Sequence, residues 1–177
     1  MDFTKLIKKR QSDRQYDTRL VESEKIMQCI EAARMAPSAC NAQPWKFIVV
    51  DEPELKNQLA SAIAGMGMNK FAFDAPTIVA IVLEKPNFMS KIGSILKGKE
   101  YTLIDIGIAA THFCLQATDL ELGTCIIGWF DEKKVRKLLH IPNKKRIPLL
   151  ITVGYSTEEL RQKHRKEVGE VWSANRY

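Results

Sequence analysis

Two arginines and a serine alternate near the N-terminus in a pattern suited to holding an anion. Arg10, Ser12 and Arg14 occupy every second position. If this segment is extended, all three side chains point to the same side, because side chains alternate along a strand. A guanidinium group presents a planar fork to phosphate, and a hydroxyl adds a further donor. The pattern favours a phosphate site; the alternative is that the arginines form surface ion pairs with Asp13, Asp17 or nearby glutamates.

A second polar stretch, APSACNAQPW at residues 36–45, joins an expected helix to an expected strand. Pro37 disfavours helical backbone in the residue before it, and the apolar run after Trp45 is typical of a buried strand. Ser38 and Asn41 carry hydrogen-bonding groups within this loop. A loop held between two packed elements suits a flat polar ligand, and the alternative is an ordinary helix-to-strand connection.

Both stretches match motifs of a known family. RxSxR at 10–14 and APSxxNxQPWxF at 36–47 resemble the nitroreductase-like family of FMN-dependent NAD(P)H oxidoreductases. The likeness continues, in family order, through DIGIAA at 105–110, LGTCIIGWF at 122–130 and VGY at 153–155. Each motif alone is short, but five in order are specific and extend over most of the chain.

The resemblance implies an architecture as well as a cofactor. It implies an α+β fold, a layered α/β structure in which a central mixed sheet is flanked by helices. It also implies an intertwined homodimer with two active sites at the subunit interface. A length of 177 residues, without a repeat or a linker-like stretch, predicts a single domain over residues 1–177.

The resemblance also implies how FMN is held. Arg10 and Ser12 would bind the phosphate, helped by Lys163 and Arg165 from the C-terminal tail. Arg14 would lie at the N1/O2 edge of the ring, where a fixed positive charge stabilises the anionic reduced flavin. No side chain is expected as a catalytic acid, because hydride is transferred at flavin N5 and the cofactor carries the electron chemistry.

Six further residues are implied as cofactor contacts: Pro37, Ser38, Asn41, Asn69, Ile127 and Gly128. The first three would reach the ribityl chain and the ring edge from the partner subunit. Asn69 would lie near the pyrimidine edge. Backbone amides around Gly128 and Trp129 would face N5.

Hydrophobic periodicity predicts the elements that position these residues. Helices are expected at 2–10, 23–35, 54–64 and 101–121 and from Asp131 to Leu139, and strands at 47–50, 77–83, 124–130 and 149–153. Ser23 and Asp131 are expected as helix N-caps, because their side-chain oxygens can accept from the first backbone amides.

The helix expected at 101–121 is apolar nearly all round, so more than one of its sides must be buried. A subunit interface is the simplest explanation, and replacing Phe113 with aspartate would then separate the subunits. The alternative is a central helix buried within one subunit.

Residues 84–100 are basic and irregular, with Pro86, Gly93 and Gly98 as breakers. The resemblance implies that this segment covers the active site as a lid. The alternative is a surface excursion.

Composition excludes several classes of protein. The chain is 45% hydrophobic and 27% charged, as expected of a soluble globular domain. No apolar run approaches the ~20 residues that span a bilayer, and the charged N-terminus does not resemble a signal peptide, so the cytoplasm is expected. The net charge of +6 is spread along the chain without an RNP, zinc-finger or helix-turn-helix pattern, so no nucleic acid is expected.

The four cysteines, Cys29, Cys40, Cys114 and Cys125, show no CxxC spacing, so neither a zinc site nor a disulfide framework is expected. Three of them lie in apolar surroundings and are interpreted as small core residues. Cys40 lies in the polar loop, where it is either a reactive thiol or a bystander. The three histidines, His112, His140 and His164, are interpreted as structural or exposed.

The predicted function is an FMN-dependent oxidoreductase that takes electrons from NADH or NADPH by a ping-pong mechanism. Nitroaromatics, quinones or similar flat, electron-poor molecules are the expected acceptors. One alternative is the same fold in other flavin chemistry, such as reductive dehalogenation or flavin fragmentation. Another is a basic, non-enzymatic module that binds a phosphorylated ligand or nucleic acid; such a module would be colourless.

Overall fold

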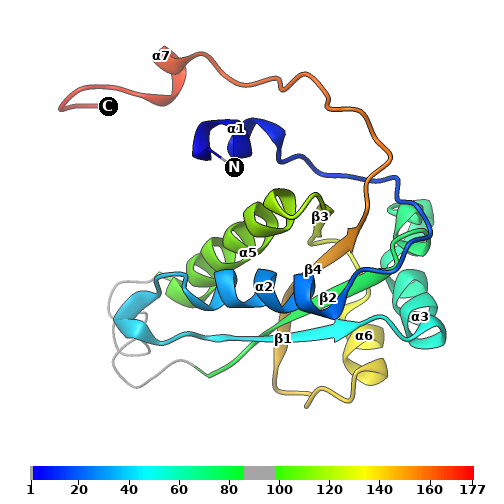
Figure 1. Cartoon of the computed structure of the whole chain (residues 1–177). Coiled ribbons are helices and arrows are strands. Elements are labelled where there is room, and N and C mark those ends of the chain that lie inside the picture. The colour runs from blue at the N-terminus through cyan, green and yellow to red at the C-terminus, as the bar shows by residue number, and fades with distance from the viewer. Residues whose placement is uncertain (1, 86–98) are drawn as a thin grey trace.

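The computed structural model describes residues 2–85 and 99–177 (Figure 1). The helices are α1 (Phe3–Lys9), α2 (Ser23–Arg34), α3 (Pro53–Ile63), α5 (Tyr101–Asp119), α6 (Glu132–Leu138) and α7 (Val168–Val171), with short 3-10 turns η1 (Ala39–Asn41), η2 (Gly65–Gly67) and η3 (Lys70–Phe73). The strands are β1 (Trp45–Val50), β2 (Thr77–Leu83), β3 (Gly123–Ile127) and β4 (Arg146–Gly154). The lid expected within 84–100 falls mostly on residues 86–98, outside the described residues.

The strands form one sheet in the order β1-β2-β4-β3, and every neighbouring pair is antiparallel. The predicted α+β fold with helices flanking a sheet is confirmed. The expected mixture of strand directions is wrong for these four strands. The chain leaves β1 at Val50 and re-enters the sheet beside it at Ile78, so β2 must run back along β1. The segment at Ser12, which is not part of a named strand, pairs in parallel with Thr124 of β3 through an isolated bridge.

The sheet is covered by a hydrophobic core on each face. Alternate residues of β2 divide between the two cores, because successive side chains point to opposite faces. Val79 and Ile81 pack with α2 and α5, whereas Ile78 and Ala80 pack with α3 and α6. Burial on both faces explains why residues 77–83 form a nearly uninterrupted apolar run, and the predicted bounds of this strand are confirmed.

Helix α5 is buried over most of its length within its own subunit. Phe113 is fully buried and stacks on Phe47 of β1, with ring centroids 6.3 Å apart. At the N-terminal end, by contrast, Leu103 and Ile104 remain 42% and 55% exposed. The expected interface at Phe113 is therefore wrong, and the exposed apolar surface of α5 lies near its beginning.

One of the two predicted N-caps is confirmed. Asp131 caps α6 by accepting a hydrogen bond from the amide of Lys134 at 3.0 Å. Ser23 is instead the first helical residue of α2, and the capping position is Glu22. The Glu22 carboxylate makes no capping bond; it accepts a hydrogen bond from the Tyr155 hydroxyl at 2.5 Å. Within the described part of the chain, we find no helix that is both long and apolar enough to cross a bilayer.

Candidate active site

The segment from Arg10 to Arg14 lies along the edge strand of the sheet. Ser12 pairs with Thr124 of β3 in a parallel bridge, and the amide of Asp13 donates to the Thr124 carbonyl at 2.9 Å. These bonds keep the segment extended. The extended backbone that the alternating pattern required is therefore present, and β3 holds it in place.

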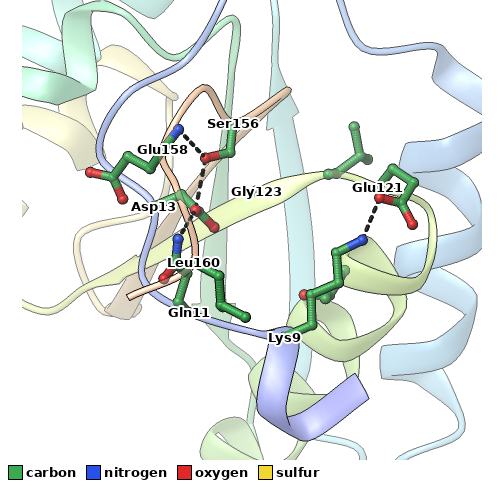
Figure 2. Close-up of a pocket in the computed structure, with 10 residues that line it drawn as sticks. Lys9, Gln11, Asp13, Glu121, Gly123, Ser156, Glu158 and Leu160 are labelled. Atoms are coloured by element: carbon green, nitrogen blue, oxygen red, sulfur yellow. Dashed lines mark hydrogen bonds and ion pairs between the residues drawn. The ribbon is translucent and has the colours of Figure 1, made fainter. Parts of the chain in front are cut away.

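Asp13 anchors this segment and was missed as a structural residue in the sequence. It is buried, and its carboxylate accepts hydrogen bonds from Gln11 Nε2 at 3.0 Å and Ser156 Oγ at 2.8 Å (Figure 2). It also accepts one from the amide of Thr124 at 3.2 Å. A Cβ on Gly123 would stand 2.9 Å from the Asp13 carboxyl carbon, so this contact needs glycine. The carboxylate is thus fully engaged with β3 and the tail.

The alternative that the arginines form surface ion pairs is wrong. Asp13 has the partners just described, and Asp17 pairs with Arg19 at 3.8 Å. Neither Arg10 nor Arg14 has a carboxylate partner among residues 2–85 and 99–177. The guanidinium of Arg14 instead lies 5.8 Å from the centre of the Phe71 ring.

The C-terminal tail crosses this segment and adds further cations. Lys163 Nζ donates to the carbonyls of Ile7, Lys8 and Arg10 at 2.7, 2.5 and 2.6 Å. An ammonium group has three donors and is favoured at the C-terminus of a helix, so Lys163 fastens the tail to the end of α1. Burial and the nearby charges of Arg10 and Arg165 lower the pKa of Lys163. Direct phosphate contact by Lys163 stays a prediction, because these carbonyls already occupy its donors.

Five of the predicted cofactor residues line one open pocket of about 310 Å³. They are Arg10, Ser12, Arg14, Lys163 and Arg165. The remaining lining residues are Gln11, Arg161, Gln162 and His164, so no carboxylate from residues 2–85 or 99–177 lines the pocket. Guanidinium and hydroxyl groups without an opposing acid are the donors that phosphate prefers.

Asn69 and the end of β3 lie next to this pocket. Asn69 Nδ2 donates to the Trp129 carbonyl at 3.3 Å, and η3, which follows Asn69, carries the Phe71 ring beneath Arg14. Ile127 is buried, whereas Gly128 and Trp129 are exposed. Asn69 therefore contacts the backbone that follows β3, and it directly precedes the turn whose Phe71 lies against Arg14.

Pro37, Ser38 and Asn41 lie apart from this pocket in the same chain. Figure 1 shows their loop (cyan) at one end of α2, while the segment after α1 (blue) and the tail (orange) run at the other end. One chain therefore presents two groups of predicted cofactor residues on separate parts of its surface. The pocket that contains Arg10 and Arg165 is not lined by any of these three loop residues.

Comparison with known proteins decides the family. The sequence profile described as "Nitroreductase family" matches residues 7–155. The chain belongs to the nitroreductase family. An oxygen-insensitive NADPH nitroreductase of Helicobacter acinonychis is 29% identical over 91% of this chain and 90% of its own. An FMN-dependent nitroreductase of Clostridium difficile R20291 has 29% identity, a TM-score of 0.80, and coverage of 97% of this chain and 98% of its own. A nitroreductase family protein of Streptococcus pneumoniae TIGR4 has 29% identity, a TM-score of 0.84, and coverage of 98% and 100%.

The cysteines of this nitroreductase are arranged as the sequence predicted. Cys29, Cys114 and Cys125 are buried, and burial raises the pKa of Cys29 to about 12 and that of Cys114 to about 11. These thiols are therefore protonated core residues at neutral pH. Cys40 is exposed, in the loop that carries Ser38.

Proposed function

We propose that this chain is an FMN-dependent NAD(P)H oxidoreductase that binds FMN between two copies of itself and reduces nitroaromatics, quinones or similar electron-poor acceptors. The observation that carries the proposal is the carboxylate-free pocket lined by Arg10, Ser12, Arg14 and Arg165. The names of the Helicobacter and Clostridium relatives, an NADPH nitroreductase and an FMN-dependent nitroreductase, agree with it.

The residues of this pocket fit the phosphate end of FMN. Arg10, Ser12 and Arg165 would hold the phosphate by charge-assisted hydrogen bonds, while Lys163 fixes the tail that carries Arg165. Arg14 would place its charge at the ring edge, where negative charge develops on reduction. When bound, FMN supplies two-electron transfer from a nicotinamide to the acceptor. The residues of this chain would bind the phosphate and orient the ring.

Exposed apolar side chains on three helices support a dimer. Phe3 and Ile7 of α1, Met27 of α2, Met35 directly after α2, and Ile104 of α5 are 44% to 66% exposed. Both α1 and α2 pack against α5, so these helices form a continuous layer. Exposed apolar side chains that gather on neighbouring helices are typical of an interaction surface. A second copy that covers this layer would bring the Ser38 loop toward the partner's phosphate pocket.

The test of this function is an initial-rate experiment with FMN-loaded protein. NADPH or NADH oxidation is followed at several fixed concentrations of a nitroaromatic and of a quinone. We expect acceptor-dependent oxidation with parallel double-reciprocal lines, because the nicotinamide leaves before the acceptor binds at the same open face. Intersecting lines would exclude the ping-pong mechanism. Oxidation that no acceptor accelerates would contradict the assigned acceptor class and favour the other flavin chemistries of this fold.

A further inference from the structure

The loop that carries Ser38 and Asn41 has an unusual backbone. Cys40, Asn41 and Gln43 have φ values of 53°, 51° and 46°, in the left-handed region. Residues with a β carbon avoid this region, because the side chain crowds the backbone there. Three such residues within four positions persist only if the surrounding structure fixes the loop.

Part of that restraint comes from within the loop. The amide of Gln43 donates to Ser38 Oγ at 3.0 Å, and the amide of Asn41 donates to the Ser38 carbonyl at 3.0 Å. These bonds shape the turn. They do not fix its position on the body of the protein.

A hydrogen bond to the long helix does fix that position. The amide of Ala39 donates to Oδ1 of Asp105 at 3.0 Å, across 66 residues of sequence. Asp105 lies in the first half of α5, and η1 packs against this helix. The loop is therefore anchored at the residue that directly follows Ser38.

The environment of Asp105 is unusual for a carboxylate. The residue is only 3% exposed, and among the described residues its Oδ2 has no hydrogen-bond partner. A buried carboxylate with so few partners is costly, so its presence in α5 needs a reason. The bond to Ala39 supplies that reason. Oδ1 accepts from the Ala39 amide, whereas Oδ2 has no hydrogen-bond partner among the described residues.

We propose that Asp105 is the positioning residue of the FMN-binding loop: by accepting from the Ala39 amide, it holds Ser38 and Asn41 where they contact FMN in the partner's pocket. The inference rests on the proposed function, since the contact with FMN belongs to that proposal. Asp105 itself does not touch the cofactor. Its neighbour Ile104 lies on the exposed apolar surface of α5. One turn of this helix would therefore contact the partner subunit through Ile104 and hold the loop through Asp105.

The test compares two substitutions of Asp105. Asp105→Leu keeps the shape but removes the acceptor, whereas Asp105→Asn keeps an acceptor for the Ala39 amide. Apoprotein is titrated with FMN by fluorescence quenching, after circular dichroism and sedimentation have shown a folded dimer. We expect FMN binding to weaken at least tenfold in Asp105→Leu and to stay within twofold in Asp105→Asn. Asn is tolerated because Oδ2 has no donor to lose among the described residues.

A second variant removes the donor instead of the acceptor. Ala39→Pro deletes the amide hydrogen, and the position suits proline because Ser38 is extended and Ala39 begins a 3-10 turn. We expect the same loss of FMN affinity as in Asp105→Leu, and no further loss when the two changes are combined, since both remove one hydrogen bond. This variant leaves α5 intact, so it tests the proposal even if Asp105→Leu does not fold.

The matched control is Thr118→Val, which changes another buried polar residue of α5. Thr118 Oγ1 donates to the Cys114 carbonyl at 2.9 Å within the helix. FMN binding should be unchanged in this variant. Wild-type affinity in both Asp105→Leu and Ala39→Pro would overturn the proposal, as would equal losses in Asp105→Leu and Asp105→Asn. A wild-type protein that does not bind FMN would instead contradict the proposed function.

Discussion

Replacing Arg10 and Arg14 together with alanine is expected to remove FMN from a protein that still folds and dimerises. Neither guanidinium has a carboxylate partner among the described residues, so little folding free energy is lost with them. Hydrogen bonds to a charged group are worth about 1.5–3 kcal/mol each. Loss of both arginines should therefore weaken FMN binding at least about a hundredfold. Flavin content of the purified variant and titration with FMN measure the effect.

The matched control removes the same charge elsewhere. Lys133 and Lys137 are exposed on α6, outside the phosphate pocket. Their double alanine variant should bind FMN as the unmodified chain does, which separates a specific site from a general effect of net charge. Riboflavin lacks the phosphate, so its affinity should differ less between the arginine variant and the control than the affinity of FMN does. Undiminished flavin content in the arginine variant would refute the phosphate assignment.

Replacing Phe113 with aspartate is expected to unfold the subunit rather than to separate a folded dimer. Phe113 is fully buried between the sheet and α2, and it stacks on Phe47. Its removal leaves a large cavity, which costs about 3–5 kcal/mol before any penalty for burying the carboxylate. That sum approaches the whole stability of a typical domain, ~5–15 kcal/mol. Circular dichroism and denaturant titration should show mostly unfolded chain at neutral pH.

Ile104→Asp is the comparison that separates core from interface. Ile104 lies on the same helix but is 55% exposed, so a folded subunit can hydrate an aspartate at this position. We expect a folded protein that sediments as a monomer and has lost its flavin. A folded Phe113→Asp protein would contradict the assigned core. An Ile104→Asp dimer that keeps its FMN would contradict the proposed interface.

Local patterns in the sequence were sufficient to predict most of the elements. The strand at 77–83 has the predicted bounds because a nearly uninterrupted apolar run favours burial on both faces. Asp131 caps α6 by accepting from the amide of Lys134, only three residues away. Ser23 was misassigned because the helical backbone already begins at this residue, which leaves Glu22 in the capping position. Strand directions also depended on which strands become neighbours, which periodicity does not encode.

In the candidate site, too, local features were predictable from the sequence and contacts between distant residues were not. The spacing of Arg10, Ser12 and Arg14 is a local property: it predicted three side chains on one side of an extended segment, and all three line the same pocket. The structural role of Asp13 depends on Ser156, 143 residues away, and that of Lys163 depends on carbonyls more than 150 residues earlier. A hydrogen bond of this kind leaves no periodic signal, so the anchors of the site became visible only in the fold.

FMN bound to this protein is expected to be reduced by a nicotinamide. The most direct measurement is the visible absorption spectrum of the purified protein, with FMN added if it is colourless, recorded anaerobically before and after NADPH and then NADH. We predict flavin bands perturbed by the protein that bleach with at least one of the two reductants. Bands that persist with both would contradict the nicotinamide-dependent activity. A protein that stays without bound flavin after FMN is added would contradict the account as a whole.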